Sequence, residues 1–269
     1  METTYYKPHP LLKKYIYKYW SWECGKNMAM PKVLPGVVTE VLFHYKVPFH
    51  FVHSKTAVSY GAKQSCIVGL RDSSYDLLTE EETGFIAVRF REGAFNNFCG
   101  TPQKEITGQF PSPFDLWGTK GGELEEKVMA APTNPERIKI IESYLFDFLA
   151  MFSHNDKRMD YIVKQVSNNA NLRCLSNELG LSYRHFNRLF TGYTGLTPKG
   201  FQKISRFDGI LRNLTLSKNR IYLNEVLNAG YYDQSHFIKD FKNFVNETPA
   251  SFLTEKHFMS HFYNTGIIN

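Results

Sequence analysis

One phrase occurs twice in this sequence, and the repeat constrains the fold more than any other feature. The first copy, "SYRHFNRLFTGYTGLTP", occupies Ser182–Pro198, and the second, "DQSHFIKDFKNFVNETP", occupies Asp233–Pro249. Both copies contain the pattern His-Phe-x-(Arg/Lys)-x-Phe, both follow a glycine at short range, and both end in Thr-Pro. A long pattern that recurs after about fifty residues predicts one supersecondary unit that the chain uses twice.

Both copies are amphipathic when they are drawn as helices. In the first copy the apolar side is formed by Phe186, Leu189, Phe190 and Tyr193. Its opposite side offers two guanidinium groups, an amide and a hydroxyl, from Arg184, Asn187, Arg188 and Thr191. In the second copy three phenylalanines share a face, and the polar residues are Gln234, Ser235, Lys239 and Lys242. Each copy therefore predicts a helix that packs through aromatic rings and exposes hydrogen-bonding groups.

The exposed groups are of the kinds that recognise bases in the major groove of DNA. Arginine bonds guanine in a bidentate way, asparagine and glutamine bond adenine, and lysine bonds guanine or a phosphate. Each helix follows a short helix and a glycine, Gly180 or Gly230, and begins at an N-cap residue, Ser182 or Asp233. Two helix-turn-helix units are therefore predicted, joined by a long helix that begins at Pro198. Further helices are expected to begin near Arg158, Leu172, Tyr222 and Pro249.

The net charge of +6 lies entirely in the second half of the chain. Residues 1–157 contain 18 Lys and Arg against 18 Asp and Glu, whereas residues 158–269 contain 14 against 8, and 14 − 8 = +6. A basic region beside a neutral one favours a polyanionic partner for the basic region alone. Charge by itself leaves open an ordinary basic domain without such a partner.

The first half of the chain is typical of short strands separated by frequent Gly and Pro. Pro35–Tyr45 and Thr83–Phe95 are rich in β-branched and aromatic residues, which favours a β-barrel or sandwich. Leu11–Trp20 has its apolar residues in adjacent pairs and is expected to form a short helix before the strands. The predicted fold class is α+β: an N-terminal β-barrel-like (cupin-like) domain with flanking helices, followed by an all-α domain.

A longer helix is expected to begin near Pro135, because apolar residues recur at intervals of three and four: Ile138, Ile141, Leu145, Phe148 and Phe152. Two heptads of this pattern fit a helix packed on its own barrel and also fit a dimer interface, and they do not decide between the two. The polar stretch Ser153–Lys157 is a plausible linker.

The sequence contains few signs of catalytic or metal chemistry. The four cysteines form no CxxC pair, so isolated and mostly buried reduced thiols are expected. His44, His50 and His53 are expected to be ordinary strand histidines, because the other ligands of a cupin metal site are missing. No P-loop, GxSxG or HExxH motif occurs. No catalytic residue, metal or cofactor is predicted, and the absence of a signal peptide or membrane span favours a cytoplasmic location.

The segment from about Arg158 to Phe252 closely resembles the DNA-binding domain of AraC/XylS-type transcription regulators. The matching stretches are "LSNELGLSYRHFNRLFTGYTGLTPKGF", "ISRFDGIL" and "GYYDQSHFIKDFKNFVNETPASF". The resemblance implies two recognition helices that enter successive major grooves on one face of double-stranded operator DNA. It implies a sequence-specific regulator rather than an enzyme, with RNA polymerase as a candidate partner and a homodimer as the candidate assembly.

Carried over position by position, the resemblance predicts which residues contact DNA. The first recognition helix would use Arg184, Asn187 and Arg188, and the second would use Gln234, Ser235 and Lys239. Ile238 would lie close enough to contact a thymine methyl group. His185 and His236 match family positions near the turn, where packing or phosphate contact is expected instead of metal binding.

One departure from the family pattern concerns the packing of the two helices in each unit. The family usually has alanine four residues before each turn glycine, whereas this chain has Ser176 and Val226. Serine fits easily, but the larger valine puts in doubt whether the second unit docks at the family's angle and inherits its sequence specificity.

The N-terminal half resembles, more weakly, the barrel-like regulatory domains that are fused to some AraC-type regulators. The stretches "LLKKYIYKYW", "VLPGVVTEVLFHY" and "IAVRFREGAFNNFCGTPQKEI" carry this resemblance. Such a domain typically binds a small-molecule effector, dimerises, or does both. We therefore expect a regulatory domain for effector sensing or dimerisation at residues 1–153 and an AraC-type DNA-binding domain at residues 158–269.

Two alternatives remain open from the sequence. The chain could be a small-molecule-binding or metal-dependent cupin-like enzyme whose helical half binds a protein partner. It could also be an architectural protein that binds DNA without sequence preference. The doubled basic helix within the only basic region favours the sequence-specific regulator over both.

Overall fold

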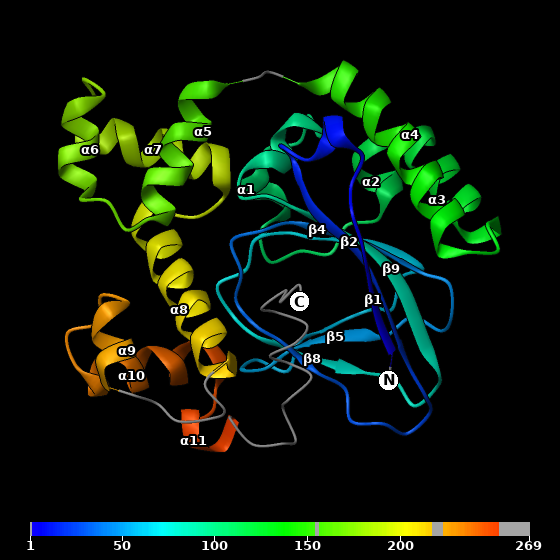
Figure 1. Cartoon of the computed structure of the whole chain (residues 1–269), viewed down its shortest axis with the longest axis horizontal. Helices are drawn as coiled ribbons and strands as arrows, with labels where there is room; N and C mark the ends of the chain where they lie inside the picture. The colour runs from blue at the N-terminus through cyan, green and yellow to red at the C-terminus, as the bar shows by residue number, and fades with distance from the viewer. Residues whose placement is uncertain (1, 154–155, 217–222, 253–269) are drawn as a thin grey trace.

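The computed structural model describes residues 2–153, 156–216 and 223–252, with side chains described except at 212–225 (Figure 1). A β-rich half comes first and a run of short helices follows, so the predicted α+β class is confirmed. In Figure 1 the helices α3 and α4 lie on one side of the sheets, and the helices from α5 to α11 lie on the other.

Two antiparallel sheets make up the β-rich half. The first has five strands in spatial order: β1 (Glu2–Tyr6), β2 (Ile16–Cys24), β9 (Thr83–Phe90), β4 (Glu40–His44) and β7 (Ser65–Val68). The second has four: β3 (Lys32–Val33), β8 (Tyr75–Leu78), β5 (His50–His53) and β6 (Ser59–Tyr60). The ladder between β2 and β9 runs from Ile16↔Phe90 to Cys24↔Thr83 and forms the middle of the larger sheet.

Aromatic side chains fill the space between the two sheets. The Phe85 ring lies 5.0 Å from Trp20 and 5.9 Å from Phe49 between centroids, both edge to face. The Phe51 ring stacks on Phe110 at 4.1 Å. All five side chains are buried. Large rings in these geometries contribute burial and an additional ring–ring attraction, so the interior between the sheets is a packed core.

Helices cover the outer face of the larger sheet: α1 (Gln103–Ile106), α2 (Pro113–Trp117), α3 (Thr119–Ala130) and α4 (Asn134–Phe152). Pro135 occupies the first turn of α4, where the helix was predicted to begin, and Thr133 caps it. The apolar seam of α4 packs against the sheet and against α2, where Phe148 stacks on Trp117 at 4.5 Å. The apolar seam of α4 therefore packs within its own domain, which is the first of the two arrangements that its spacing fits.

The helix expected at Leu11–Trp20 is a wrong prediction. A short 3₁₀ helix occupies Pro10–Leu12, and the chain then enters β2, which lies between β1 and β9. Most of β2 is buried, so its apolar residues do not alternate strictly and their adjacent pairs resemble helical spacing. The aromatic and β-branched residues of this stretch favour a strand, and that preference prevails.

Within residues 156–216 and 223–252 the structure has seven helices: α5 (Lys157–Ser167), α6 (Leu172–Glu178), α7 (Tyr183–Thr194), α8 (Pro198–Leu216), α9 (Leu223–Asn228), α10 (Gln234–Val245) and α11 (Pro249–Phe252). The pairs α6–α7 and α9–α10 are the two predicted helix-turn-helix units, and α8 joins them. Three parts of the sequence predictions lie outside the described residues. They are the expected helix start at Tyr222, residues 154–155 of the predicted linker Ser153–Lys157, and residues 253–269 of the expected second domain.

The described part of the chain contains no helix that is both long and apolar enough to cross a membrane. Within the same residues no three His, Cys, Asp or Glu side chains gather in a group suited to a metal ion. Cys24, Cys66 and Cys99 are buried and Cys174 is exposed, and all four are free thiols. Burial of His44 among aromatic rings lowers its pKa to about 4, because the charged form is poorly solvated there.

Candidate nucleic-acid interface

The two recognition helices, α7 and α10, begin with the same kind of cap. The hydroxyl of Ser182 accepts a hydrogen bond from the amide of His185 at 3.3 Å. The carboxylate of Asp233 accepts the corresponding bond from the amide of His236 at 2.7 Å. Each cap satisfies one of the amides that a helix leaves unpaired in its first turn. Both predicted N-caps are therefore confirmed.

Glycine in the left-handed region forms the turn before each recognition helix. The φ angle is 66° at Gly180 and 84° at Gly230, a conformation that costs glycine little and most other residues more. Four residues earlier, Ser176 and Val226 are both buried, at 1% and 0% exposure. The hydroxyl of Ser176 donates to the carbonyl of Arg173 at 2.9 Å, so the polar residue is satisfied within its own helix.

The Thr-Pro that ends each copy begins the helix after the recognition helix. Thr197 Oγ1 accepts a hydrogen bond from the amide of Gly200 at 3.1 Å, at the start of α8. Thr248 Oγ1 accepts the equivalent bond from the amide of Ser251 at 3.1 Å, at the start of α11. Proline is suited to the first helical position that follows, because its missing N–H would have no partner there. The last two residues of the phrase are thus a cap and a helix start.

The phenylalanines of the phrase hold each recognition helix to its neighbours. Phe190 meets Phe201 of α8 edge to face, with 5.3 Å between ring centroids. Phe241 meets Phe207 of α8 at 5.4 Å and Phe252 of α11 at 5.6 Å. All five rings are 0% exposed and belong to one core that runs through both units. The two units and the linker helix therefore share a single hydrophobic core.

The predicted DNA-contacting residues lie on the surfaces of α7 and α10. Five of the six are exposed: Arg184, Arg188, Gln234, Ser235 and Lys239. Asn187 is partly buried, and its Nδ2 donates to the carbonyl of Tyr183 at 2.8 Å. A bidentate bond from Asn187 to adenine would require that local bond to be given up. Ile238 is partly buried and packs on the core of the helical region.

A buried carboxylate inside the second recognition helix is a feature that the sequence reasoning missed. Asp240 is 3% exposed, and its Oδ1 accepts a hydrogen bond from Nζ of Lys203 on α8 at 3.0 Å. Its Oδ2 lies 3.7 Å from Nε2 of His236, whose ring also packs against Tyr231. The first copy has Leu189 at the equivalent position. An acid on the apolar face of the second copy was the available sequence signal for this contact.

The β-rich half supplies hydrogen-bond donors to the last turn of α10. The amide of Ser74 donates to the carbonyl of Phe244 at 3.1 Å, and its hydroxyl donates to the carbonyl of Val245 at 3.3 Å. Lys32 Nζ lies 3.4 Å from the same Val245 carbonyl and 2.8 Å from the carboxylate of Glu247. The last carbonyls of a helix lack partners within it and carry partial negative charge, so a buried lysine is well placed there.

The end of α7 is bound to the β-rich half in a different way. Asn96 Nδ2 donates to the carbonyl of Tyr193 at 3.0 Å. Gly195, with φ of 81°, lies so close to α1 that a Cβ on it would stand 2.0 Å from Oγ1 of Thr107 and 3.0 Å from the carbonyl oxygen of Gln103. Both recognition helices are thus fixed at their C-terminal ends by the β-rich half, while their N-terminal halves expose the predicted DNA-contacting residues.

Comparisons with known proteins match two separate parts of this chain. Residues 175–255 match a family model described as a helix-turn-helix domain, and residues 4–112 match one described as a domain of unknown function, DUF6597. An uncharacterized HTH-type transcriptional regulator of Haemophilus influenzae is 27% identical over 164 residues, which are 58% of this chain and 53% of that protein. The matched region therefore spans about half the length of that relative.

Solved structures of ToxT from Vibrio cholerae are also similar to this chain. One crystal form gives a TM-score of 0.49 at 12% identity, covering 87% of this chain and 97% of ToxT. ToxT from strain O395 gives a TM-score of 0.49 at 14% identity, covering 95% of this chain and 100% of that one.

Proposed function

We propose that this chain is an AraC/XylS-type, sequence-specific transcription regulator that inserts α7 and α10 into successive major grooves. The observation that carries the proposal is the doubled unit itself. Two helices with the same caps and the same aromatic contacts expose different polar residues on a common core. One asymmetric chain would in this way recognise a longer DNA site than a single helix could.

The six predicted residues have distinct roles in this proposal. Arg184 and Arg188 on α7, and Lys239 on α10, are placed to bond guanine or phosphate. Asn187 and Gln234 are the candidates for adenine, and Ser235 bonds either a base or the backbone. The exposure of five of the six supports this assignment. So does the lack of acidic residues among the exposed side chains of α7.

Residues 1–153 would act as the regulatory domain, and residues 158–269 would form the DNA-binding domain. Hydrogen bonds from Asn96, Ser74 and Lys32 to the ends of α7 and α10 support a role for the first domain in setting the spacing of the two helices. We also propose that the protein forms a homodimer and contacts RNA polymerase. Both contacts would use surfaces other than the two recognition helices. The match to a helix-turn-helix domain favours this function over a cupin-like enzyme.

Fluorescence anisotropy with the full-length protein tests the proposal. A labelled duplex carrying a site selected from random DNA is compared with a scrambled duplex of the same length while the salt concentration is raised. We expect the selected site to bind at least about 10³-fold more tightly, and affinity for both duplexes to fall steeply with salt. Equal affinities would favour an architectural protein, and no salt-sensitive binding would favour the enzyme alternative.

A further inference from the structure

The linker helix α8 makes polar contacts with both helix-turn-helix units from neighbouring positions. Gln202 Nε2 donates a hydrogen bond to the carbonyl of Ala170, in the loop that leads into the first unit, at 2.7 Å. Lys203 Nζ donates to Oδ1 of Asp240, within α10, at 3.0 Å. Figure 1 shows α8 running from the first unit to the second. Two adjacent residues of one helix therefore connect the loop before α6 with the second recognition helix.

Asp240 occupies a position on α10 that would suit an apolar side chain. The other buried side chains of this helix are apolar: Phe237, Phe241, Phe244 and Val245. Among the described residues no donor lies within hydrogen-bond range of Asp240 Oδ2, and Nε2 of His236 stands 3.7 Å away. A buried oxygen without a hydrogen bond costs free energy, and Leu189 at the equivalent position of α7 avoids that cost. Stability alone therefore does not account for an acid at this position.

The ion pair supplies a direction that the apolar contacts of α10 lack. Packing such as that of Phe241 on Phe207 tolerates small rotations of a helix, because the hydrophobic effect is non-directional. A buried carboxylate loses much more when its partner moves out of reach. Lys203 therefore favours the rotation of α10 about its own axis that keeps Asp240 paired. Lys239 is exposed and next to Asp240 in the chain, so the same rotation sets its direction.

The polar contacts at the two ends of α10 depend less on this rotation. Arg206 Nη1 donates to the carbonyl of Gly230, in the turn before α10, at 3.0 Å. At the other end Ser74 and Lys32 contact the last carbonyls of the helix. These acceptors belong to the main chain, which lies close to the helix axis, whereas a side chain extends outward from it. Rotation of α10 therefore displaces the Asp240 carboxylate more than it displaces these carbonyls.

We propose that Lys203 and Asp240 are positioning residues for DNA recognition. Their ion pair fixes the orientation of α10 relative to α7 and so sets the spacing that the chain accepts between the two parts of its DNA site. This inference rests on the proposed function, because it concerns how two recognition helices reach one site together. One added base pair moves the second part by about 3.4 Å and turns it by about 35°. A chain whose α10 is fixed tolerates that change poorly.

Binding to duplexes of altered spacing tests the proposal. Fluorescence anisotropy with the full-length protein compares the selected site with versions that carry one base pair more or one fewer between the parts read by α7 and α10. We expect the wild-type protein to lose about tenfold or more in affinity on either change. The double variant Lys203→Met/Asp240→Leu should lose less than about threefold. Equal discrimination in the two proteins, or none in the wild type, would overturn the proposal.

Stability measurements and matched variants separate positioning from a merely structural role. Apolar replacement of a buried ion pair often leaves stability unchanged or raises it, so the double variant should unfold thermally at no lower temperature than the wild type. Lys203→Arg keeps the charge and should keep the spacing discrimination. Lys199→Met removes an exposed cation from the same helix and should keep it too. A loss of discrimination in Lys199→Met as large as that in the double variant would contradict the assignment.

Distances between the two helices in the absence of DNA distinguish failure of this inference from failure of the regulatory function. Spin labels at Arg188→Cys and Asn243→Cys, both exposed positions, report on α7 and α10 by double electron–electron resonance. Cys174→Ser removes the exposed native thiol, and the other three are buried. We expect a narrow distance distribution with the ion pair and a broader one in the double variant.

Equal widths of the two distributions would overturn the positioning role even where DNA binding is sequence-specific. A broader distribution in the double variant, together with binding that shows no sequence preference, would reject the regulatory function while the effect of the ion pair on α10 stands.

Discussion

The two recognition helices are built alike but held differently. Both start at a capped first turn and end at a residue with positive φ, Gly195 in one case and Asn246 in the other. Two phenylalanines of α7 and three of α10 are buried in one core. At the end of α7 the contact with the β-rich half is a side-chain amide and close packing of backbone. At the end of α10 it includes a buried lysine, Lys32, and two bonds from Ser74.

This difference separates what the repeated phrase specifies from what each copy adds. The residues common to both copies specify a capped recognition helix and the start of the helix that follows. They do not determine which residues outside the helix-turn-helix unit contact it. The positions that differ carry the exposed polar side chains that we propose contact DNA and, in the second copy, a carboxylate that contacts α8. Matched substitutions in the two copies therefore test which properties are common and which are particular.

The largest expected effect comes from the shared aromatic contacts. Phe190→Ala and Phe241→Ala should each lower the free energy of unfolding of the helical part by about 3–5 kcal/mol, because each leaves a cavity in a fully buried core. Chemical denaturation of the full-length variants measures this. A loss below about 1 kcal/mol in either variant would contradict the shared core, since partial collapse alone does not offset a buried ring. Tyr232→Ala, at a side chain with 86% exposure, is the control.

The two helix ends should respond differently to alanine. Gly195→Ala should lower the free energy of unfolding for two reasons. An alanine in the left-handed region costs about 1–2 kcal/mol. Its Cβ would also overlap Thr107 and approach the carbonyl oxygen of Gln103, which costs about 1–3 kcal/mol. Asn246→Ala carries only part of the first cost, because asparagine already has a Cβ in the left-handed region, and it loses one hydrogen bond to the Ser54 carbonyl. Thermal unfolding should therefore show the larger loss for Gly195→Ala. The double variant Thr107→Ala/Gly195→Ala should recover part of it, and no recovery would place the cost elsewhere.

Removing a contact between the β-rich half and one recognition helix should affect that helix and not the other. Lys32→Met removes a buried ammonium group that contacts the Val245 carbonyl and the Glu247 carboxylate, and it should lower the free energy of unfolding by about 1.5–3 kcal/mol. Asn96→Ala removes a hydrogen bond between neutral groups and should lower it by about 0.5–1.5 kcal/mol. Hydrogen exchange should accelerate in the last turn of α10 for Lys32→Met and in the last turn of α7 for Asn96→Ala. Acceleration of both turns by either variant would mean that the two ends open together.

The sequence predicted much of the helical half because its signals are local. Caps such as Ser182, turn glycines such as Gly180 and the apolar spacing of each copy act within a few residues, and the structure has them where they were expected. The β2 strand was missed because burial on both faces removes the alternation that marks a strand. Strand pairing and sheet order depend on contacts between distant residues, for which a single sequence gives little information.

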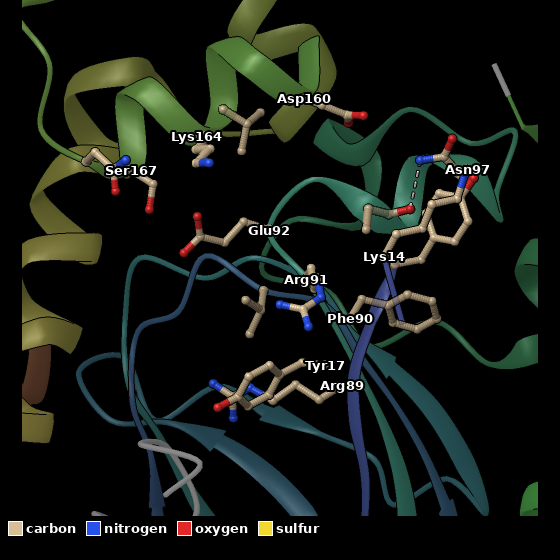
Figure 2. Close-up of a pocket in the computed structure, with 15 residues that line it drawn as sticks. Lys14, Tyr17, Arg89, Phe90, Arg91, Glu92, Asn97, Asp160, Lys164 and Ser167 are labelled. Carbon is tan, nitrogen blue, oxygen red and sulfur yellow. Dashed lines mark hydrogen bonds between the residues drawn. The ribbon is translucent and has the colours of Figure 1, made fainter. Parts of the chain in front are cut away.

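The candidate site was predictable to a similar extent. Exposed polar positions on α7 and α10 follow from helical spacing, and the six side chains among them were named from the family resemblance. The bond from Asn187 to the Tyr183 carbonyl, the burial of Asp240 against Lys203, and the donors from Asn96 and Ser74 could not be named, because each depends on packing across elements. A pocket of about 520 Å³ that Tyr17, Arg91 and Lys164 line between the β-rich half and α5 (Figure 2) could not be predicted for the same reason, since its walls are far apart in sequence.

The smallest and most specific effects should be those on base recognition. Arg188→Ala and Lys239→Ala occupy equivalent places in the two copies, and both side chains are exposed, so neither should change stability by more than about 0.5 kcal/mol. Each should weaken binding to the selected DNA site by about 1–3 kcal/mol if it contacts a base. Anisotropy measurements at fixed salt give these values. Lys139→Ala on α4 is the matched control for loss of a surface charge.

Selection of preferred sites from random DNA by the full-length protein and these two variants tests the central claim most directly. We predict that Arg188→Ala relaxes sequence preference in one part of the site and Lys239→Ala in another, with the two parts about one helical turn, 10–10.5 base pairs, apart. Relaxation at the same bases in both variants, or an unchanged site in both, would contradict the account that the two helices read different bases.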